Sequence, residues 1–210
     1  MIKKYYEAKI LPSLINCCCA TKPINYQRQK IIPQASGRIL EIGIGSGLNL
    51  SYYDKSKVSK IVAIEPSDEL NKIAQKNALK NDINVELITG IAENIEIEDK
   101  SIDTIIMTYT LCTIPDTKLA LNEIKRVMKP DAKILFSEHG IAPDEKIIKW
   151  QNRINPIWNN FFGGCNLNRN IPYLIKDAGF KFDLIEQMYL PSTPKFIGYN
   201  YWGSASLVNE

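Results

Sequence analysis

The sequence predicts an α/β fold built around a mostly parallel sheet. Short apolar runs typical of buried strands alternate with amphipathic helical segments from about residue 38 to residue 179. A glycine-rich turn, Gly43-x-Gly45-x-Gly47, follows the first apolar run, and the second run ends in an acid, Glu65. Strands separated by helices pair in parallel, and such sheets bind ligands at the carboxyl ends of their strands. The sequence therefore predicts a ligand site at the glycine turn.

The composition fits a single globular domain. The chain has 210 residues, of which 45% are hydrophobic and 23% charged, with a formal net charge of +3. This small charge, without a lysine or arginine cluster, argues against nucleic acid as a partner. The first residues do not resemble a signal peptide, and no apolar run is long enough to cross a bilayer. We expect a cytoplasmic protein without a transmembrane segment; peripheral membrane contact and the oligomeric state stay open.

The chain has few cysteine and histidine residues, and their spacing is not typical of metal sites. The chain has five cysteines and one histidine, His139, and no two cysteines have the C-x-x-C spacing. The sequence therefore predicts no metal site and no disulfide framework. Cys17, Cys18 and Cys19 are consecutive, and we expect them to be small buried residues.

The N-terminal segment, residues 1–36, is predicted to be helical. A short amphipathic helix is expected over residues 2–16, where Pro12 can introduce a kink, and a second helix over residues 24–34.

The glycine turn follows a predicted strand that includes Ile39, Leu40 and Ile42, and a helical pattern resumes at Leu48. Glycines permit positive φ angles and close backbone approach, and a helix that begins there would direct free N–H groups at a ligand. The dinucleotide fingerprint would need glycine in place of Leu48, and no Walker A lysine is present. A tight turn without a ligand is the alternative.

The pattern Glu41-x-Gly43-x-Gly45-x-Gly47 resembles motif I of the class I S-adenosylmethionine-dependent methyltransferases. The resemblance implies a Rossmann-like fold that binds S-adenosylmethionine and releases S-adenosylhomocysteine. Glu41 and the three glycines are then cofactor-binding residues.

Glu65 lies at the end of a strand predicted over residues 60–65, about 20 residues beyond the glycine turn, where a carboxylate can accept both ribose hydroxyls. A helix N-cap role is less apt, because Pro66 follows and Ser67 or Asp68 can cap the helix expected over residues 67–81. We include Pro66 in the cofactor site.

A third strand, residues 84–89, leads to a turn that in these methyltransferases holds the adenine. The acid common in the family is replaced by Ile91, so adenine binding would depend on the backbone around Ala92. Glu93 matches a glutamate common in the motif, with a helix-capping role as the alternative.

The fourth strand, residues 101–108, ends in Thr-Tyr-Thr-Leu-Cys, which should border the methionine part of the cofactor; Thr108 and Leu111 are assigned to this part. A helix is expected from Asp116 to about Lys129. A fifth strand, residues 132–138, then places His139 at its carboxyl tip.

Three further motifs sharpen the resemblance: Phe136-Ser-Glu-His-Gly140, Asn155-Pro-x-Trp158 and Gly164-Cys-Asn-Leu-Asn-Arg169. They resemble the methyltransferase-like 7 proteins, which are thiol S-methyltransferases, and small bacterial relatives often labelled phospholipid methyltransferases. The similarity covers about residues 38–202. It departs at the N-terminus, where the membrane anchor of the animal proteins is not seen, and at Lys-Pro-Asp131-Ala, where Lys-Pro-Gly-Gly is usual.

The last helix, capped by Asn168 or Asn170, should end at Gly179, and strands are expected over residues 180–189 and 196–207. The resemblance implies a seven-stranded sheet of order 3-2-1-4-5-7-6, with strand seven antiparallel and helices on both faces. We expect one domain over residues 1–210, in which four consecutive parts form an N-terminal lid (1–36), a cofactor-binding core (37–140), an acceptor cap (141–170) and a last helix with an edge hairpin (171–210).

The leading hypothesis is methyl transfer to a small acceptor, and the resemblance favours a lipophilic thiol. A phospholipid amine or a quinone is the alternative acceptor, and a catalytically silent S-adenosylmethionine-binding module is the alternative class. His139 is the candidate base, because its unperturbed pKa lies near neutrality; a purely structural role is the alternative. The candidate acceptor-binding residues are Tyr5, Cys112, Trp150, Trp158, Asn166 and Asn168.

Overall fold

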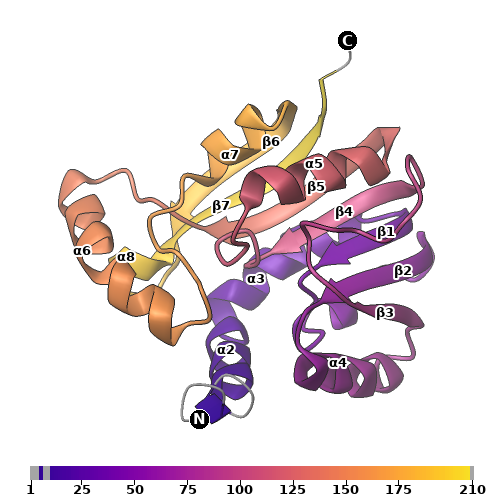
Figure 1. Ribbon diagram of the computed structural model, residues 1–210, viewed down its shortest axis with the longest axis horizontal. Coiled ribbons are helices and arrows are strands. Elements are labelled where there is room, and N and C mark those ends of the chain that lie inside the picture. The colour runs from indigo at the N-terminus through magenta and orange to yellow at the C-terminus, as the bar shows by residue number, and fades with distance from the viewer. Residues whose placement is uncertain (1–4, 7–9, 209–210) are drawn as a thin grey trace.

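The computed structural model describes residues 5–6 and 10–208. Its centre is one seven-stranded sheet in the order β3-β2-β1-β4-β5-β7-β6 (Figure 1). Strand β7 is antiparallel to both of its neighbours, and the pairs among β1 to β5 are parallel. The predicted order and the antiparallel seventh strand are confirmed. The strands are β1 Gly37–Ile42, β2 Val58–Glu65, β3 Val85–Thr89, β4 Ile102–Thr108, β5 Met128–His139, β6 Phe180–Tyr189 and β7 Tyr199–Leu207.

Helices cover both faces of the sheet, as predicted. Ala120, Leu121 and Ile175 of α5 and α7 belong to the apolar core on one face, and Ile31 and Ala74 of α3 and α4 belong to the core on the other. The central strands are buried on both sides, which explains their continuous apolar runs. The helices are α2 Leu11–Cys19, α3 Lys22–Ile31, α4 Asp68–Lys80, α5 Thr117–Val127, α6 Glu145–Phe161, α7 Ile171–Asp177 and α8 Lys195–Gly198.

The connection from β1 to β2 differs from the one that the sequence predicts. No α-helix begins at Leu48; turns lead into a short 3₁₀ segment, Leu50–Tyr52, because the link is short and the buried side chains of Asn49 and Leu50 tie it to the core. The helix-dipole part of the sequence argument therefore fails here. The free N–H groups of the glycine turn remain.

The N-terminal region differs from the expectation in two ways. Pro12 lies in the first turn of α2, where proline fits without a kink, and part of the predicted 2–16 helix lies outside the described residues. Cys17 and Cys18 are exposed rather than buried, and Cys19 is half-buried. One face of α2 is thus turned away from the protein core.

Helices α2 and α6 stand beyond the carboxyl ends of the parallel strands (Figure 1). Helix α6 was not predicted from the sequence, and α8 replaces the first residues of the strand expected from Phe196. Within residues 5–6 and 10–208, every helix is too short or too polar to cross a membrane.

Candidate active site

The glycine turn has the backbone conformation that its sequence predicts. Gly43, Gly45 and Gly47 have φ angles of 67°, 57° and 80°. A Cβ atom at Gly43 would collide with the hydroxyl of Thr110, whereas a Cβ at Gly45 would meet nothing within 4 Å. The backbone at Gly45 therefore faces open space, which fits close approach by a ligand.

Glu65 lies beside this turn, at the carboxyl end of β2. Its side chain is buried; Oε2 accepts the Gly45 N–H at 3.0 Å and Oε1 accepts the Ser67 N–H at 3.0 Å. Burial raises the pKa of Glu65, although both hydrogen bonds oppose the rise. Ser67 caps α4 by accepting the Leu70 N–H, so Glu65 is not the N-cap. Each carboxylate oxygen keeps a lone pair for a ribose hydroxyl.

Glu41 lies beneath the turn rather than facing the ligand space. It accepts hydrogen bonds from Asn49 Nδ2 at 2.8 Å and from the Tyr53 hydroxyl at 2.6 Å. Burial raises its pKa to about 7. Asn49 also donates to Thr108 Oγ1 and accepts from Arg28 Nε at 3.0 Å. Glu41 thus orients Asn49, which lines the cavity above the turn.

That cavity has a volume of only about 60 Å³, and α2 lies over it. Ile15, Asn16 and Cys19 contribute to its walls, and Asn16 Oδ1 accepts a hydrogen bond from Ser46 Oγ at 2.5 Å. Ligand pockets are usually about 300–1,000 Å³. We therefore expect helix α2 to shift when a nucleoside-sized cofactor binds.

Of the other predicted cofactor residues, Thr108 lines the cavity and the rest lie outside its wall. Pro66 is exposed next to Glu65. Ala92 is buried, and Glu93 accepts the N–H of Asp116, the N-cap of α5. Leu111 is fully buried in the apolar core and lines neither this cavity nor the pocket described next.

A second and larger pocket of about 350 Å³ adjoins the first. Most of its wall is apolar: Ile24, Trp158, Phe162, Leu190, Pro194 and Ile197 come from α3, the end of α6 and the segment before β7. The Trp158 and Phe162 rings stack with centroids 3.8 Å apart. Such a pocket suits a small apolar molecule.

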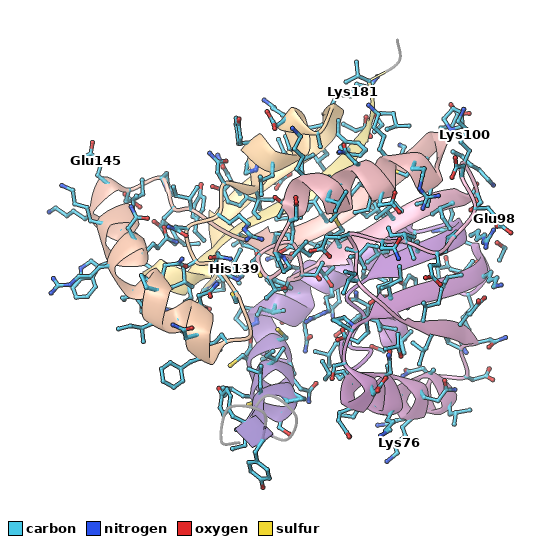
Figure 2. The ribbon with its side chains drawn as sticks, in the orientation of Figure 1. Lys76, Glu98, Lys100, His139, Glu145 and Lys181 are labelled. Carbon is cyan, nitrogen blue, oxygen red and sulfur yellow. The ribbon has the colours of Figure 1, made fainter. Side chains whose placement is uncertain are left out.

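Polar side chains gather at one end of this pocket. His139 Nε2 lies 3.2 Å from Cys165 Sγ, which lies 3.7 Å from Cys112 Sγ. Cys112 and Cys165 are buried, and half-buried His139 lies where the sheet meets α2 and α6 (Figure 2). The hydrogen bond with Cys112 and the nearby His139 hold the pKa of Cys165 far below that of an ordinary thiol. The same hydrogen bond with Cys165 raises the pKa of Cys112. Burial lowers the pKa of His139, but Cys165 outweighs it and raises the value.

Hydrogen bonds to the backbone hold these three residues together. Buried Glu138 accepts the N–H groups of Thr110 and Leu111 at 2.9 and 3.0 Å. Arg169 Nη1 donates to the carbonyls of Leu111 and Ile114. The N–H and the side-chain amide of Asn166 both donate to the Cys112 carbonyl. The Glu-His and Cys-Asn-Leu-Asn-Arg motifs thus fasten the turn after β4 to the segment after α6.

Tyr109 separates the two cavities and lines both. Its φ angle is 56°, a left-handed conformation that is strained for a bulky aromatic residue and is often found at functional sites. Its hydroxyl donates to Asn200 Oδ1 at 2.8 Å, and its N–H donates to the Ser137 carbonyl. Nothing local in the sequence indicates this conformation.

The structure brings three of the predicted acceptor-site residues together, namely His139, Cys112 and Trp158. Tyr5 and Trp150 are 65% and 57% exposed and line no part of the pocket. The Asn166 side chain donates to the Cys112 and Gly164 carbonyls and accepts from the side chains of Asn155 and Asn159. Half-buried Asn168 donates to Asn152. The sequence analysis did not single out Cys165 and Tyr109, although Cys165 stands within the Gly-Cys-Asn-Leu-Asn-Arg motif.

Comparisons with known proteins agree with this architecture. Residues 40–136 match the model of a methyltransferase domain. The chain thus carries a methyltransferase domain, and its sheet order is that of the class I S-adenosylmethionine-dependent methyltransferases.

Among its relatives, the chain is 28% identical over 169 residues to thiol S-methyltransferase TMT1B of Rattus norvegicus, covering 76% of this chain and 68% of the relative. It is 26% identical over 177 residues to thiol S-methyltransferase TMT1A of Homo sapiens, covering 82% and 72%. The crystal structure of a SAM-dependent methyltransferase from Aquifex aeolicus shares the fold with a TM-score of 0.68 and 20% identity, over 95% of this chain and 100% of that one. The chain is thus distantly related to thiol S-methyltransferases.

Proposed function

We propose that this enzyme transfers a methyl group from S-adenosylmethionine to the sulfur of a small apolar thiol. The observation that carries the proposal is the apolar pocket that ends in Cys112, His139 and Cys165 and adjoins the glycine-turn cavity. The thiol methyltransferases among its relatives support the same acceptor class.

The residues around the glycine turn fit the cofactor. Glu65 would accept the ribose hydroxyls, and the backbone at Gly43, Gly45 and Gly47 would lie along the amino-acid part, where the open space at Gly45 leaves room. Ala92 and Glu93 remain proposed neighbours of the adenine. Bound S-adenosylmethionine would supply a methyl group on a positively charged sulfur; the acceptor sulfur would attack the methyl carbon in line, and S-adenosylhomocysteine would leave.

The chain must also ionise and orient the acceptor. A free thiol with a pKa near 8.5 is mostly protonated at neutral pH, and the thiolate is the nucleophile. The thiol therefore has to lose its proton inside the pocket. We propose that His139 promotes this deprotonation. The apolar wall formed by Trp158, Phe162 and Ile197 would hold the rest of the acceptor and exclude water.

A matched set of acceptors tests the proposal. Purified protein is incubated with methyl-labelled S-adenosylmethionine and an alkyl thiol, or the primary amine or the alcohol of the same chain length, and the labelled product is measured together with S-adenosylhomocysteine. We expect labelled thioether from the thiol and no product above background from the amine or the alcohol. Methylation of the amine with an inert thiol, or no S-adenosylhomocysteine with any acceptor, contradicts a thiol methyltransferase.

A further inference from the structure

We propose that Cys112, His139 and Cys165 form a three-ligand site for a divalent ion of the zinc class, with a fourth position open to the acceptor pocket. The three ligand atoms lie within 4.8 Å of one another. They come from three separate segments: the turn after β4, the tip of β5 and the segment after α6. The sequence predicted no metal site because C-x-x-C spacing is absent. Ligands that come from three separate segments do not need such spacing.

The distances fit tetrahedral coordination. Zinc binds sulfur at about 2.3 Å and imidazole nitrogen at about 2.0–2.1 Å, so tetrahedral angles place two sulfurs about 3.8 Å apart and sulfur and nitrogen about 3.5 Å apart. The observed separations are 3.7 Å between the sulfurs and 3.2 Å between Cys165 Sγ and His139 Nε2. The third pair, Cys112 and His139, has its ligand atoms within 4.8 Å of each other, so these two side chains would draw together around a bound ion.

The setting fits an open rather than a closed metal site. Structural zinc ions usually have four protein ligands, whereas catalytic zinc ions have three and keep one position for water or substrate. All three ligand residues line the 350 Å³ pocket, whose other walls are largely apolar. The backbone carrying Cys112 is fixed by Asn166 and Arg169, so the ligands are held before an ion binds. Two thiolates would balance the charge of a divalent ion.

Such an ion would activate the acceptor, a consequence that rests on the proposed thiol substrate. A thiol that binds at the open position loses its proton: the S–H bond breaks, a sulfur–metal bond forms, and the proton leaves to solvent. The thiolate would then lie in the pocket that shares Tyr109 with the proposed cofactor cavity. His139 would serve this step as a ligand, and a metal-free His139 acting as a base is the alternative outcome.

Cobalt binding tests the site independently of methylation. The full-length protein is reduced, treated with a chelator that is then removed, and titrated with Co²⁺ while the thiolate-to-cobalt charge-transfer and d–d absorption bands are followed. We expect tetrahedral-type bands that saturate at one equivalent and are displaced by Zn²⁺. Cys165→Ser and His139→Asn should each weaken binding at least tenfold, and Cys17→Ser, which changes an exposed cysteine outside the pocket, should bind like the parent.

Circular dichroism and thermal unfolding show whether each variant folds. Cys165→Ser and His139→Asn are compared because Cys112 is the more deeply buried of the two thiols, 2% exposed against 9% for Cys165. No charge-transfer band in the parent, or equal binding by the parent and both variants, overturns the proposed site. Metal binding without methylation of any thiol would retain the site and reject the proposed function. Undiminished thiol methylation by protein that shows no cobalt bands would reject the metal site and retain the proposed function.

Discussion

The two cavities of this enzyme are built in contrasting ways. The proposed cofactor cavity takes its largest share of lining residues from one short stretch, the turn after β1 (Gly43–Asn49). The rest comes from α2, Arg28, Leu70 and the end of β4. The acceptor pocket takes its walls from α3, α6 and the segment before β7, and its sulfur and imidazole groups from three further places. Among the residues that the structure describes, only Tyr109, Cys19 and Ile15 line both. The first cavity therefore depends mainly on one local turn, whereas the second pocket depends on the packing of several distant segments.

Removing the carboxylate of Glu65 should have the largest effect, confined to the cofactor side. Glu65→Ala would lose two charge-assisted hydrogen bonds to the ribose, each worth about 1.5–3 kcal/mol, so cofactor affinity should fall about a hundredfold or more. Isothermal calorimetry with S-adenosylhomocysteine measures this. Glu86→Ala removes a carboxylate that pairs with Lys60 on the sheet surface, and it should bind normally. An unchanged affinity in Glu65→Ala would remove Glu65 from the site.

The buried Glu41 should make stability depend on pH. Its pKa rises from an ordinary 4.5 to about 7 in the folded protein, so the native state binds more protons than the unfolded state between these values. Protonated Glu41 therefore stabilises the folded state fully below pH 4.5. This part of the free energy of unfolding, about 3 kcal/mol, is lost as the pH rises to 7. Urea unfolding at pH 5 and pH 8 should show that Glu41→Gln removes this part of the loss. Equal pH dependence in parent and variant would mean that Glu41 titrates normally.

The strand positions and the glycine turn could be predicted because they depend on local apolar runs and glycine spacing, whereas the sheet order was predicted only through the resemblance to class I methyltransferases. It failed at Leu48, where the short link and buried Asn49 prevent a helix. It also could not group Cys112, His139 and Cys165, because only the folding of three separate segments brings their side chains together. Periodicity likewise could not tell which tryptophan of the 141–170 segment faces the pocket.

The two tryptophans of α6 form a matched pair that sharpens the comparison. Trp158 lines the pocket, and Trp150 is 57% exposed on the same helix. Trp158→Ala should remove about 1–2 kcal/mol of apolar contact with the acceptor, a roughly 5- to 30-fold rise in KM for an alkyl thiol. Trp150→Ala should leave KM unchanged. A larger effect from Trp150 would place the acceptor elsewhere.

The smallest expected effect concerns α2 as a lid. Asn16→Ala removes the hydrogen bond to Ser46 that holds α2 over the glycine turn. A typical hydrogen bond contributes about 1 kcal/mol, so the closed form should weaken and S-adenosylhomocysteine should bind severalfold more tightly. The same calorimetric titration measures this change. Weaker binding would show that Asn16 contacts the cofactor instead of blocking it.

The division between the two cavities is tested most directly by measuring cofactor affinity and thiol turnover in the same variant. Cys165→Ser changes one atom at the end of the acceptor pocket and lines no part of the glycine-turn cavity. We predict that its Kd for S-adenosylhomocysteine stays within about twofold of the parent value, while turnover of an alkyl thiol falls at least a hundredfold, a change of about 2.7 kcal/mol in the barrier. Cys17→Ser should match the parent in both measurements. Normal thiol turnover by Cys165→Ser, or a loss of cofactor affinity equal to the loss of turnover, would contradict a separate acceptor site at this cluster.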